Sequence, residues 1–391
     1  ATSGSDITET YSTASASAMT VGAAGGTMEV SLASDNTNAT LFSAGTDVEL
    51  AAFRFYATTT EDVELEYLYL TQVVTDTSSS SYKDYDEIWF VDESGTEVAG
   101  TRMAPTSTKP KINFSDDAFV VSKDDNNGAT LYLMADLADI SNSANGVSDH
   151  FLGYKINVKA DVTAVGALTG TGTGEFLSST DAPTGNTHYV YRGVPKVEIL
   201  PIVGEVSESA TQPALGNGAN DLFRFRVTAL NNDIALSSFI FDITTTGANV
   251  TDLYIYNVTT DTEEVLNDTI GTPDADIYTW ETSGADWTTA EASGQVKVPT
   301  SIPQTFLVRG TVTGASSGDS VRVRMAGDAA HVAGTDTLMH TSLEVSTDAN
   351  DDFIWSDLSA GSHSVSTDDW TNGYLVKGLN SISSTATTVS L

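Results

Sequence analysis

VELAAFRFYATTTEDVELEYLYL, at residues 48–70, recurs in altered form as DLFRFRVTALNNDIALSSFIF at residues 221–241. The triplet Phe-Arg-Phe occurs in both copies, at 53–55 and at 223–225, and a turn follows each triplet. Apolar and polar residues alternate in both copies with a period of two, which is typical of strands that bury one face in a core. Each copy is therefore predicted to form a β-hairpin.

The likeness between the two halves continues downstream in the same order. Residues 88–91 match 253–256, residues 130–133 match 305–308, and residues 156–158 match 321–323. Ordered self-similarity of this kind indicates a tandem duplication. We predict an all-β protein of two tandem immunoglobulin-like β-sandwich domains, at residues 27–194 and 195–391, with a flexible N-terminal arm at residues 1–26.

The composition narrows the classes of partner. The chain has 53 acidic and 17 basic residues, a formal net charge of -36, and no cysteine. Such a negative field repels nucleic-acid phosphates and anionic lipid head groups, and no apolar run approaches the roughly 18 residues of a spanning helix. We therefore expect no nucleic-acid binding and no membrane insertion, whereas a crowded carboxylate surface favours divalent cations.

Two acidic loops are candidates for a metal site. Asp124 and Asp125 lie in KDDNNG at residues 123–128, and Asp348, Asp351 and Asp352 lie in DANDD at residues 348–352. Several oxygen ligands within a few residues suit Ca²⁺, which takes about six to eight of them. These five aspartates form the candidate calcium site, and the alternative is that both loops are acidic turns facing water.

No pattern indicates an enzyme. The histidines lie in separate contexts without His-x-x-His spacing, at His150, His188, His331, His340 and His363. No nucleophile elbow is present, and acidic residues are too numerous for a catalytic pair to stand out. The glycine-rich segment 170–174, GTGTG, lacks phosphate-loop spacing and is expected to be a plain loop. We expect neither catalytic residues nor an organic cofactor.

Aromatic and basic side chains leave alternatives open. The tryptophans of the second half, Trp280, Trp287, Trp355 and Trp370, form a sugar-binding platform if they are exposed, or fill cores and the domain junction if they are buried. Lys109 and Lys111 make the most basic local patch, which is either a docking site for an acidic neighbour or a pair of solvated loop charges.

The two ends of the chain are candidates for contacts between subunits. Residues 1–26 are rich in Ala, Ser, Thr and Gly and act either as a linker or as an arm that bridges subunits. Residues 381–391, SISSTATTVSL, carry no charged side chain and have strand propensity. This segment is predicted to add an edge strand to its own sheet or, as the alternative, to that of a neighbour.

The closing segment resembles a known family. Residues 353–357, FIWSD, and residues 369–374, DWTNGY, are similar to the end of secreted surface proteins of Patescibacteria, the candidate-phyla bacteria, with Asn380 where a proline is usual; LAAFRFYAT at residues 50–58 resembles their immunoglobulin-like modules. The resemblance implies an extracellular, cell-surface protein of an S-layer or filament, and it carries over no catalytic residue. We therefore expect a structural subunit that assembles with copies of itself, with cell-wall glycans as a further partner. The alternative is a monomeric adhesin or pair of carbohydrate-binding modules.

Overall fold

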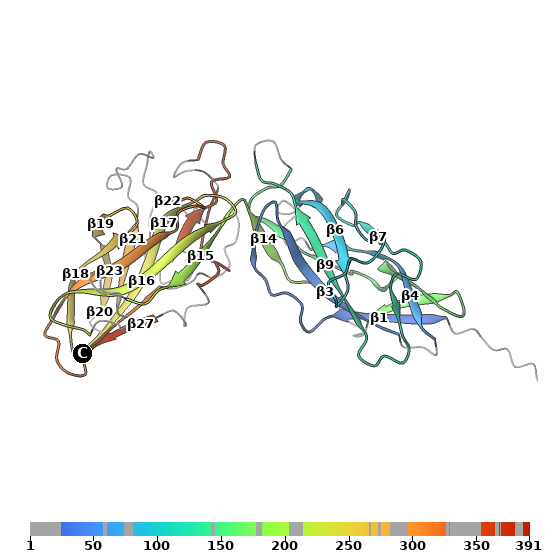
Figure 1. The fold of residues 1–391 in the computed structure, drawn as a ribbon, viewed down its shortest axis with the longest axis horizontal. Coiled ribbons are helices and arrows are strands. Elements are labelled where there is room, and N and C mark those ends of the chain that lie inside the picture. The colour runs from blue at the N-terminus through green and yellow to red at the C-terminus, as the bar shows by residue number, and fades with distance from the viewer. Residues whose placement is uncertain are drawn as a thin grey trace, which may run out of the picture.

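A computed structural model describes residues 25–57, 61–73, 81–141, 145–176, 182–202, 214–265, 267–272, 275–281, 296–325, 328, 353–363, 367, 369–379 and 386–391. Within these residues the regular structure is β-strands and two single-turn 3-10 helices, without an α-helix. The predicted all-β fold of two tandem immunoglobulin-like sandwiches is confirmed, and the sandwiches lie end to end in Figure 1. Residues 1–24 of the predicted flexible arm lie outside the described residues.

The first domain packs two layers of strands. One layer is a sheet with the order β13-β1-β3-β9-β6, made of β13 (Gly172–Phe176), β1 (Gly26–Leu32), β3 (Asp47–Ala57), β9 (Ala129–Leu137) and β6 (Tyr85–Val91). The facing layer is made of β12 (Val162–Gly166), β4 (Val63–Tyr69), β7 (Lys111–Asn113) and β8 (Val120–Val121). Short elements complete the domain: β2 (Leu41–Ser43), β5 (Thr71–Gln72), β10 (His150–Leu152), β11 (Tyr154–Lys155), β14 (His188–Tyr191), η1 (Tyr82–Asp84) and η2 (Lys159–Asp161).

The second domain repeats this arrangement. Its first sheet has the order β15-β16-β23-β18-β19, made of β15 (Val194–Ile199), β16 (Gly218–Leu230), β23 (Gln304–Thr313), β18 (Asn249–Asn257) and β19 (Thr262–Val265). The facing sheet is built from β20 (Asn267–Thr272), β21 (Ala275–Glu281), β17 (Ile234–Thr246), β24 (Ser320–Met325), β27 (Ala386–Ser390), β22 (Val296–Val298), β25 (Phe353–Ser356) and β26 (Trp370–Thr371).

Aromatic side chains from both layers fill each core. Phe55 of β3 is fully buried and meets Phe119 edge-on, with ring centroids 5.4 Å apart. In the second domain Phe225 of β16 meets Phe239 of β17 from the opposite sheet, with centroids 5.2 Å apart. Along most of these strands every second residue faces the core, so burial of one face explains the alternation seen in the sequence.

The order of strands supports the duplication and corrects one match. Strands β1, β3, β9 and β6 hold the positions that β15, β16, β23 and β18 hold in the second domain. Residues 321–323 belong to β24, whose counterpart is β12, because β12 pairs with β4 as β24 pairs with β17. The match of 321–323 to residues 156–158 is therefore wrong. An Ile-x-Val pattern is too short to fix the position of a strand.

The β-hairpin predicted within residues 48–70 is also wrong. Strand β3 lies in the five-stranded sheet and β4 in the facing layer, and β16 and β17 are divided in the same way. The chain therefore passes from one layer to the other after each Phe-Arg-Phe triplet. Both arrangements bury one face of each strand, so the alternation of residues cannot distinguish them.

Residues 172–174 of the predicted loop GTGTG are part of strand β13, which runs parallel to β1. A Cβ atom at Gly174 would lie 2.4 Å from Cβ and 2.6 Å from the carbonyl oxygen of Val162 in β12. Glycine is thus required for β13 to pass this close to β12. The glycines of this segment therefore reflect the close packing of two backbones, and the expectation of a plain loop is wrong for residues 172–174.

The C-terminal segment adds a strand to its own domain, as predicted. Strand β27 pairs antiparallel with β24, with Val389 opposite Val321. Figure 1 places this strand and the C-terminus at the end of the second domain that is remote from the first.

Candidate functional site

The junction between the two domains is formed by a very short connection. Strand β14 of the first domain ends at Tyr191 and β15 of the second begins at Val194. A Cβ at Gly193 would lie 2.6 Å from the carbonyl oxygen of Asn232, and the side-chain amide of Asn232 donates to the Arg192 carbonyl at 2.9 Å. The connection is thus packed directly on the second domain.

Strand β14 serves both domains through its alternating faces. Val190 belongs to the apolar core of the first domain, whereas Tyr191 belongs to that of the second. The Tyr191 ring lies 5.0 Å from Trp355 and the Tyr189 ring lies 5.9 Å from Tyr374. A strand with apolar residues on both faces is therefore inserted between the two cores.

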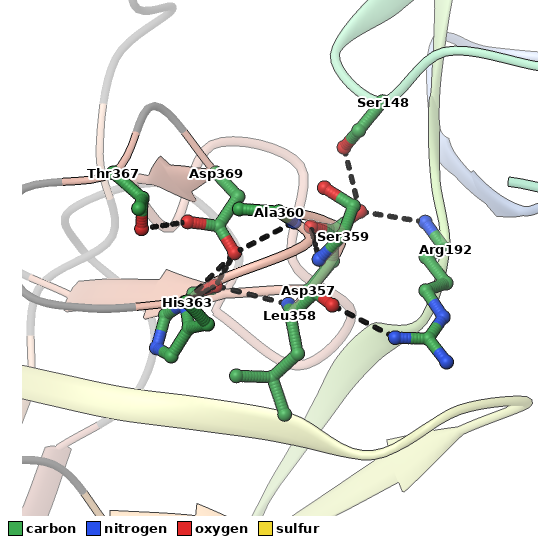
Figure 2. A network of polar contacts seen from close by, with 10 residues as sticks. Ser148, Arg192, Asp357, Leu358, Ser359, Ala360, His363, Thr367 and Asp369 are labelled. Carbon is green, nitrogen blue, oxygen red and sulfur yellow. Dashed lines mark hydrogen bonds and ion pairs between the residues drawn. The ribbon is translucent and has the colours of Figure 1, made fainter. Parts of the chain in front are cut away.

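Asp357 is the central polar residue of the junction (Figure 2). Its Oδ2 accepts hydrogen bonds from the Ser148 hydroxyl at 2.6 Å and from the Arg192 backbone N–H at 2.7 Å. The Arg192 guanidinium in turn donates to the carbonyl of Leu358 at 2.7 Å. Ser148 comes from the first domain, so a side chain of each domain is bonded across the boundary.

The Asp357 carboxyl is completely buried, and this burial raises its pKa above the ordinary value of 3.8. The hydrogen bonds from Ser148, Ser359 and Arg192 act in the opposite direction and stabilise the carboxylate. Burial dominates because the charged form gives up its water when the two domains close on it.

A second polar cluster lies beside Asp357 on the same loop (Figure 2). Asp369 Oδ2 lies 2.8 Å from His363 Nδ1 and accepts from the Ser356 hydroxyl at 3.0 Å. Burial acts to raise the pKa of Asp369, but the hydrogen bonds from His363 and Thr367 and the His363 charge outweigh it and lower the pKa to about 2. These bonds join Ser356, His363 and Thr367 to one carboxylate beside Asp357.

Ser356, His363 and Asp369 are not arranged as a hydrolase triad. In a triad the serine and the carboxylate contact different ring nitrogens. Here the Ser356 hydroxyl, at 3.5 Å, and the Asp369 carboxylate both face Nδ1 of His363, and Ser356 has no exposed surface. The arrangement fits a structural role.

A cavity of about 530 Å³ opens at this junction. Tyr191 and Trp370 give it aromatic walls, while Asp149 and Asp369 contribute carboxylates. The Tyr191 hydroxyl donates to Asp149 at 2.7 Å, so part of this polar lining is already engaged. Its volume is in the range of small-ligand sites.

The candidate calcium ligands are not brought together among the described residues. Asp124 and Asp125 lie in an exposed turn, where Asp125 Oδ1 accepts from the Asn127 N–H at 2.9 Å. Asp348, Asp351 and Asp352 lie outside the described residues. Within the part of the chain that is described, no group of three or more acidic or histidine side chains has the geometry of a metal site. The two aspartates of the 123–128 turn do not by themselves fit the ligand number of Ca²⁺.

The other candidate residues have mixed outcomes. Trp355 is fully buried and Trp370 is 6% exposed, so both belong to the junction rather than to an exposed platform. The side chains of Trp280 and Trp287 lie outside the description, as do His331 and His340. His188 is buried and bonds the Leu50 carbonyl at 2.9 Å, and His150 pairs with Asp84 at 2.9 Å.

The junction itself was missed by the sequence reasoning. Tyr189, Val190 and Tyr191 are consecutive apolar residues just before the domain boundary. A strand in which apolar residues do not alternate with polar ones has both faces buried. This run of three apolar residues was therefore the sequence signal for a strand between two cores. No sequence signal links Ser148 with Asp357.

Comparison with known proteins gives only distant matches, with none to a protein-family model or a curated protein. Among solved structures, CBD12 from CALX1.2 is 10% identical over 78% of this chain and 84% of its own, with a TM-score of 0.26. The secreted serine protease VesC from Vibrio cholerae is 10% identical over 71% of this chain and 49% of its own, with a TM-score of 0.18. SGBP-B of Bacteroides ovatus, in complex with a mixed-linkage heptasaccharide, is 9% identical over 70% of this chain and 51% of its own, with a TM-score of 0.14. Scores this low carry no argument about function.

Among the described residues, no helix has the length and apolarity needed to span a bilayer.

Proposed function

We propose that this chain is an extracellular structural subunit whose two domains act as one rigid body, and that copies of it assemble into a surface layer or filament. The observation that carries the proposal is the junction, where Tyr191 packs on Trp355 and Asp357 is bonded to Ser148. Aromatic residues that an adhesin would expose for ligand contact are used here to join the domains.

Rigidity favours ordered assembly for a thermodynamic reason. A subunit that already holds its assembled shape loses less conformational freedom when it binds a neighbour. An elongated body that makes unlike contacts at its two ends or faces forms an open chain of subunits. The resemblance to Patescibacterial surface proteins points to the same role and remains a prediction, as do the surface location, the lack of enzymatic activity and a calcium requirement.

The second candidate is a carbohydrate-binding or adhesin function at the junction. It is favoured by one observation, the cavity lined by Tyr191, Trp370, Asp149 and Asp369. Aromatic side chains and carboxylates that line one cavity suit the apolar contact and hydrogen bonding of a sugar. In this case the protein works as a monomer.

Electron microscopy and sedimentation velocity at low micromolar concentration test the proposal, first with calcium and then with chelator. Sheets or fibres support the structural function, and their dissolution by chelator supports a calcium bridge. Single particles under all conditions, together with saturable binding of an oligosaccharide that is lost in Trp370→Ala, establish the second candidate instead.

A variant with a loosened junction tests the role of rigidity. Asp357→Ala removes the acceptor that joins the two domains, and Asp116→Ala makes the same charge change at an exposed site. We expect shorter or disordered assemblies for Asp357→Ala and normal ones for Asp116→Ala. Equal order in both variants contradicts the proposed role of the junction.

A further inference from the structure

The outer face of the β4–β7 layer carries a group of aromatic and basic side chains. Tyr67 and Tyr69 of β4 are half-buried and meet edge-on, with centroids 5.8 Å apart. The Lys111 ammonium lies 3.7 Å from the centre of the Tyr67 ring, and that of Lys109 lies 5.4 Å from the Tyr69 ring. These four residues are here called the Tyr–Lys patch.

The patch stands out against the charge of the chain. Two more lysines lie at this end of the layer. Lys155 pairs with Thr71 in the strand register. Lys159 begins η2, whose Asp161 lies 2.7 Å from the Lys109 ammonium, and Lys159 itself is ion-paired with Glu175. Four of the nine lysines in a chain of net charge -36 are therefore gathered here. The Lys109 side chain is 46% exposed, so its ammonium, although paired with Asp161, can still be reached by a further anionic partner.

The opposite face of the same sandwich carries the complementary charge. On the five-stranded sheet Asp136 of β9 lies directly between Asp47 of β3 and Glu87 of β6 in the strand register. A bulge in β6 adds Asp86 beside Glu87. These four residues are here called the carboxylate row.

Like charges directly opposite each other on neighbouring strands are destabilising. Burial and then the charges of Asp47, Asp86 and Glu87 raise the pKa of Asp136. Within the described structure Arg102 offsets part of this repulsion through its 2.9 Å ion pair with Glu87. One arginine charge against four carboxylates leaves three carboxylates without a balancing positive charge. Any further cation that reaches the row therefore relieves the remaining repulsion.

We propose that the Tyr–Lys patch of one molecule docks on the carboxylate row of a second copy of this chain. The inference rests on the proposed self-assembly and names its contact surfaces. Patch and row lie on opposite faces of one sandwich, so the contact is heterologous and leaves a free patch and a free row on every pair. Assembly through it continues instead of closing as a dimer.

Exposed ion pairs are individually weak and are screened by salt. The contact therefore depends on several lysine–carboxylate pairs at once, with the tyrosine rings supplying apolar area. Association is expected to fall steeply between about 20 mM and 300 mM NaCl, because the Debye length shortens from tens of ångströms to a few over this range.

Charge reversal provides the test, with sedimentation velocity as the measurement. Lys109→Glu with Lys111→Glu makes the patch acidic, and Asp47→Lys with Asp86→Lys makes the row basic at two exposed positions. Each double variant alone is expected to associate at least about tenfold more weakly than the wild type, because like charges then face each other. An equimolar mixture of the two is expected to recover association, since the acidic patch of one can meet the basic row of the other.

Matched controls separate local charge from net charge. Lys83→Glu with Lys123→Glu changes the net charge as much as the patch variant does, at two exposed lysines outside the patch. Asp116→Lys with Asp124→Lys does the same for the row variant. Both controls are expected to associate much as the wild type does, and circular dichroism verifies that all four variants fold.

The outcomes distinguish this contact from the proposed function. Failure of the wild type to associate under any condition overturns both. Assembly of the wild type and of both reversed variants with equal strength overturns only the patch-to-row contact. If association is lost only in the patch variant and the mixture does not recover it, the patch-to-row contact is also overturned. That result indicates that the patch binds an anionic polymer of another kind. If association is lost only in the row variant and chelator has the same effect on the wild type, the row binds a divalent cation. That result also overturns the patch-to-row contact.

Discussion

The Ser148 hydroxyl donates a 2.6 Å hydrogen bond to Oδ2 of Asp357, a residue 209 positions further along the chain. The same oxygen accepts from the backbone N–H of Arg192, in the connection between the domains. One buried carboxylate therefore fixes both the first domain and the connection to the second. The relative placement of the two sandwiches depends on this atom as well as on the packing of Tyr191 against Trp355.

Removal of the Asp357 carboxylate is predicted to loosen the junction. In Asp357→Ala the Ser148 hydroxyl and the Arg192 N–H lose their acceptor, which costs about 2–3 kcal/mol if they stay buried. Small-angle scattering is expected to show a wider range of interdomain distances, and chemical denaturation a lower stability. Ser148→Ala, which removes one donor and leaves Arg192 bonded, is the milder control. A scattering profile of Asp357→Ala identical to that of the wild type contradicts the prediction.

The raised pKa of Asp357 predicts a pH dependence of stability. A carboxyl whose folded pKa lies above 3.8 binds its proton more tightly in the folded state, so its contribution to stability is lost as the pH rises through the folded pKa. Asp357→Asn keeps an acceptor oxygen and removes the titration. Its free energy of unfolding is expected to fall less than that of the wild type as the pH rises from about 4 towards 8. Parallel curves for the two proteins argue against this titration.

Asp369 is predicted to give stability the opposite pH dependence to that of Asp357, and to do so at lower pH. Its pKa of about 2 lies below the ordinary 3.8, so its stabilising contribution is present above pH 4 and is lost as the pH falls towards 2. The difference corresponds to roughly 2 kcal/mol. Acid unfolding followed by tryptophan fluorescence should begin at higher pH in His363→Gln, which removes the cationic partner. An unchanged acid midpoint in that variant would refute the role of His363.

Close packing of β13 on β12 predicts that Gly174 cannot be replaced without cost. In Gly174→Ala the new Cβ would lie 2.4 Å from that of Val162, so the strands must separate. Overpacking of this kind costs about 1–3 kcal/mol. Gly216→Ala is a matched control, because no atom lies within 4 Å of its added Cβ, and it should change the free energy of unfolding by less than about 0.5 kcal/mol. Similar thermal midpoints for the two variants would show that β13 can shift freely.

The strand content was predictable because the alternation of apolar and polar residues is a local pattern. The Phe-Arg-Phe triplets place Phe55 and Phe225 in their cores, as a period of two requires. The pattern could not decide the partner of each strand, and the hairpin assigned to residues 48–70 became two strands in different layers. GTGTG looked like a loop because the sequence does not show that Val162 passes next to Gly174.

By itself, the sequence determined the all-β class, the acidity of the surface and the strand propensity of the C-terminal segment, because each depends on composition or on residues close in the chain. It also determined the two copies of the domain, because a repeat is found by comparing the sequence with itself and needs no contact between the copies. Only the tertiary structure decided that Ser148 meets Asp357 and that Tyr191 packs on Trp355. It also decided that the Tyr–Lys patch and the carboxylate row lie on opposite faces of one sandwich. These relations join residues far apart in sequence, and they arise from the energy of burying apolar and polar groups together once both sandwiches have formed.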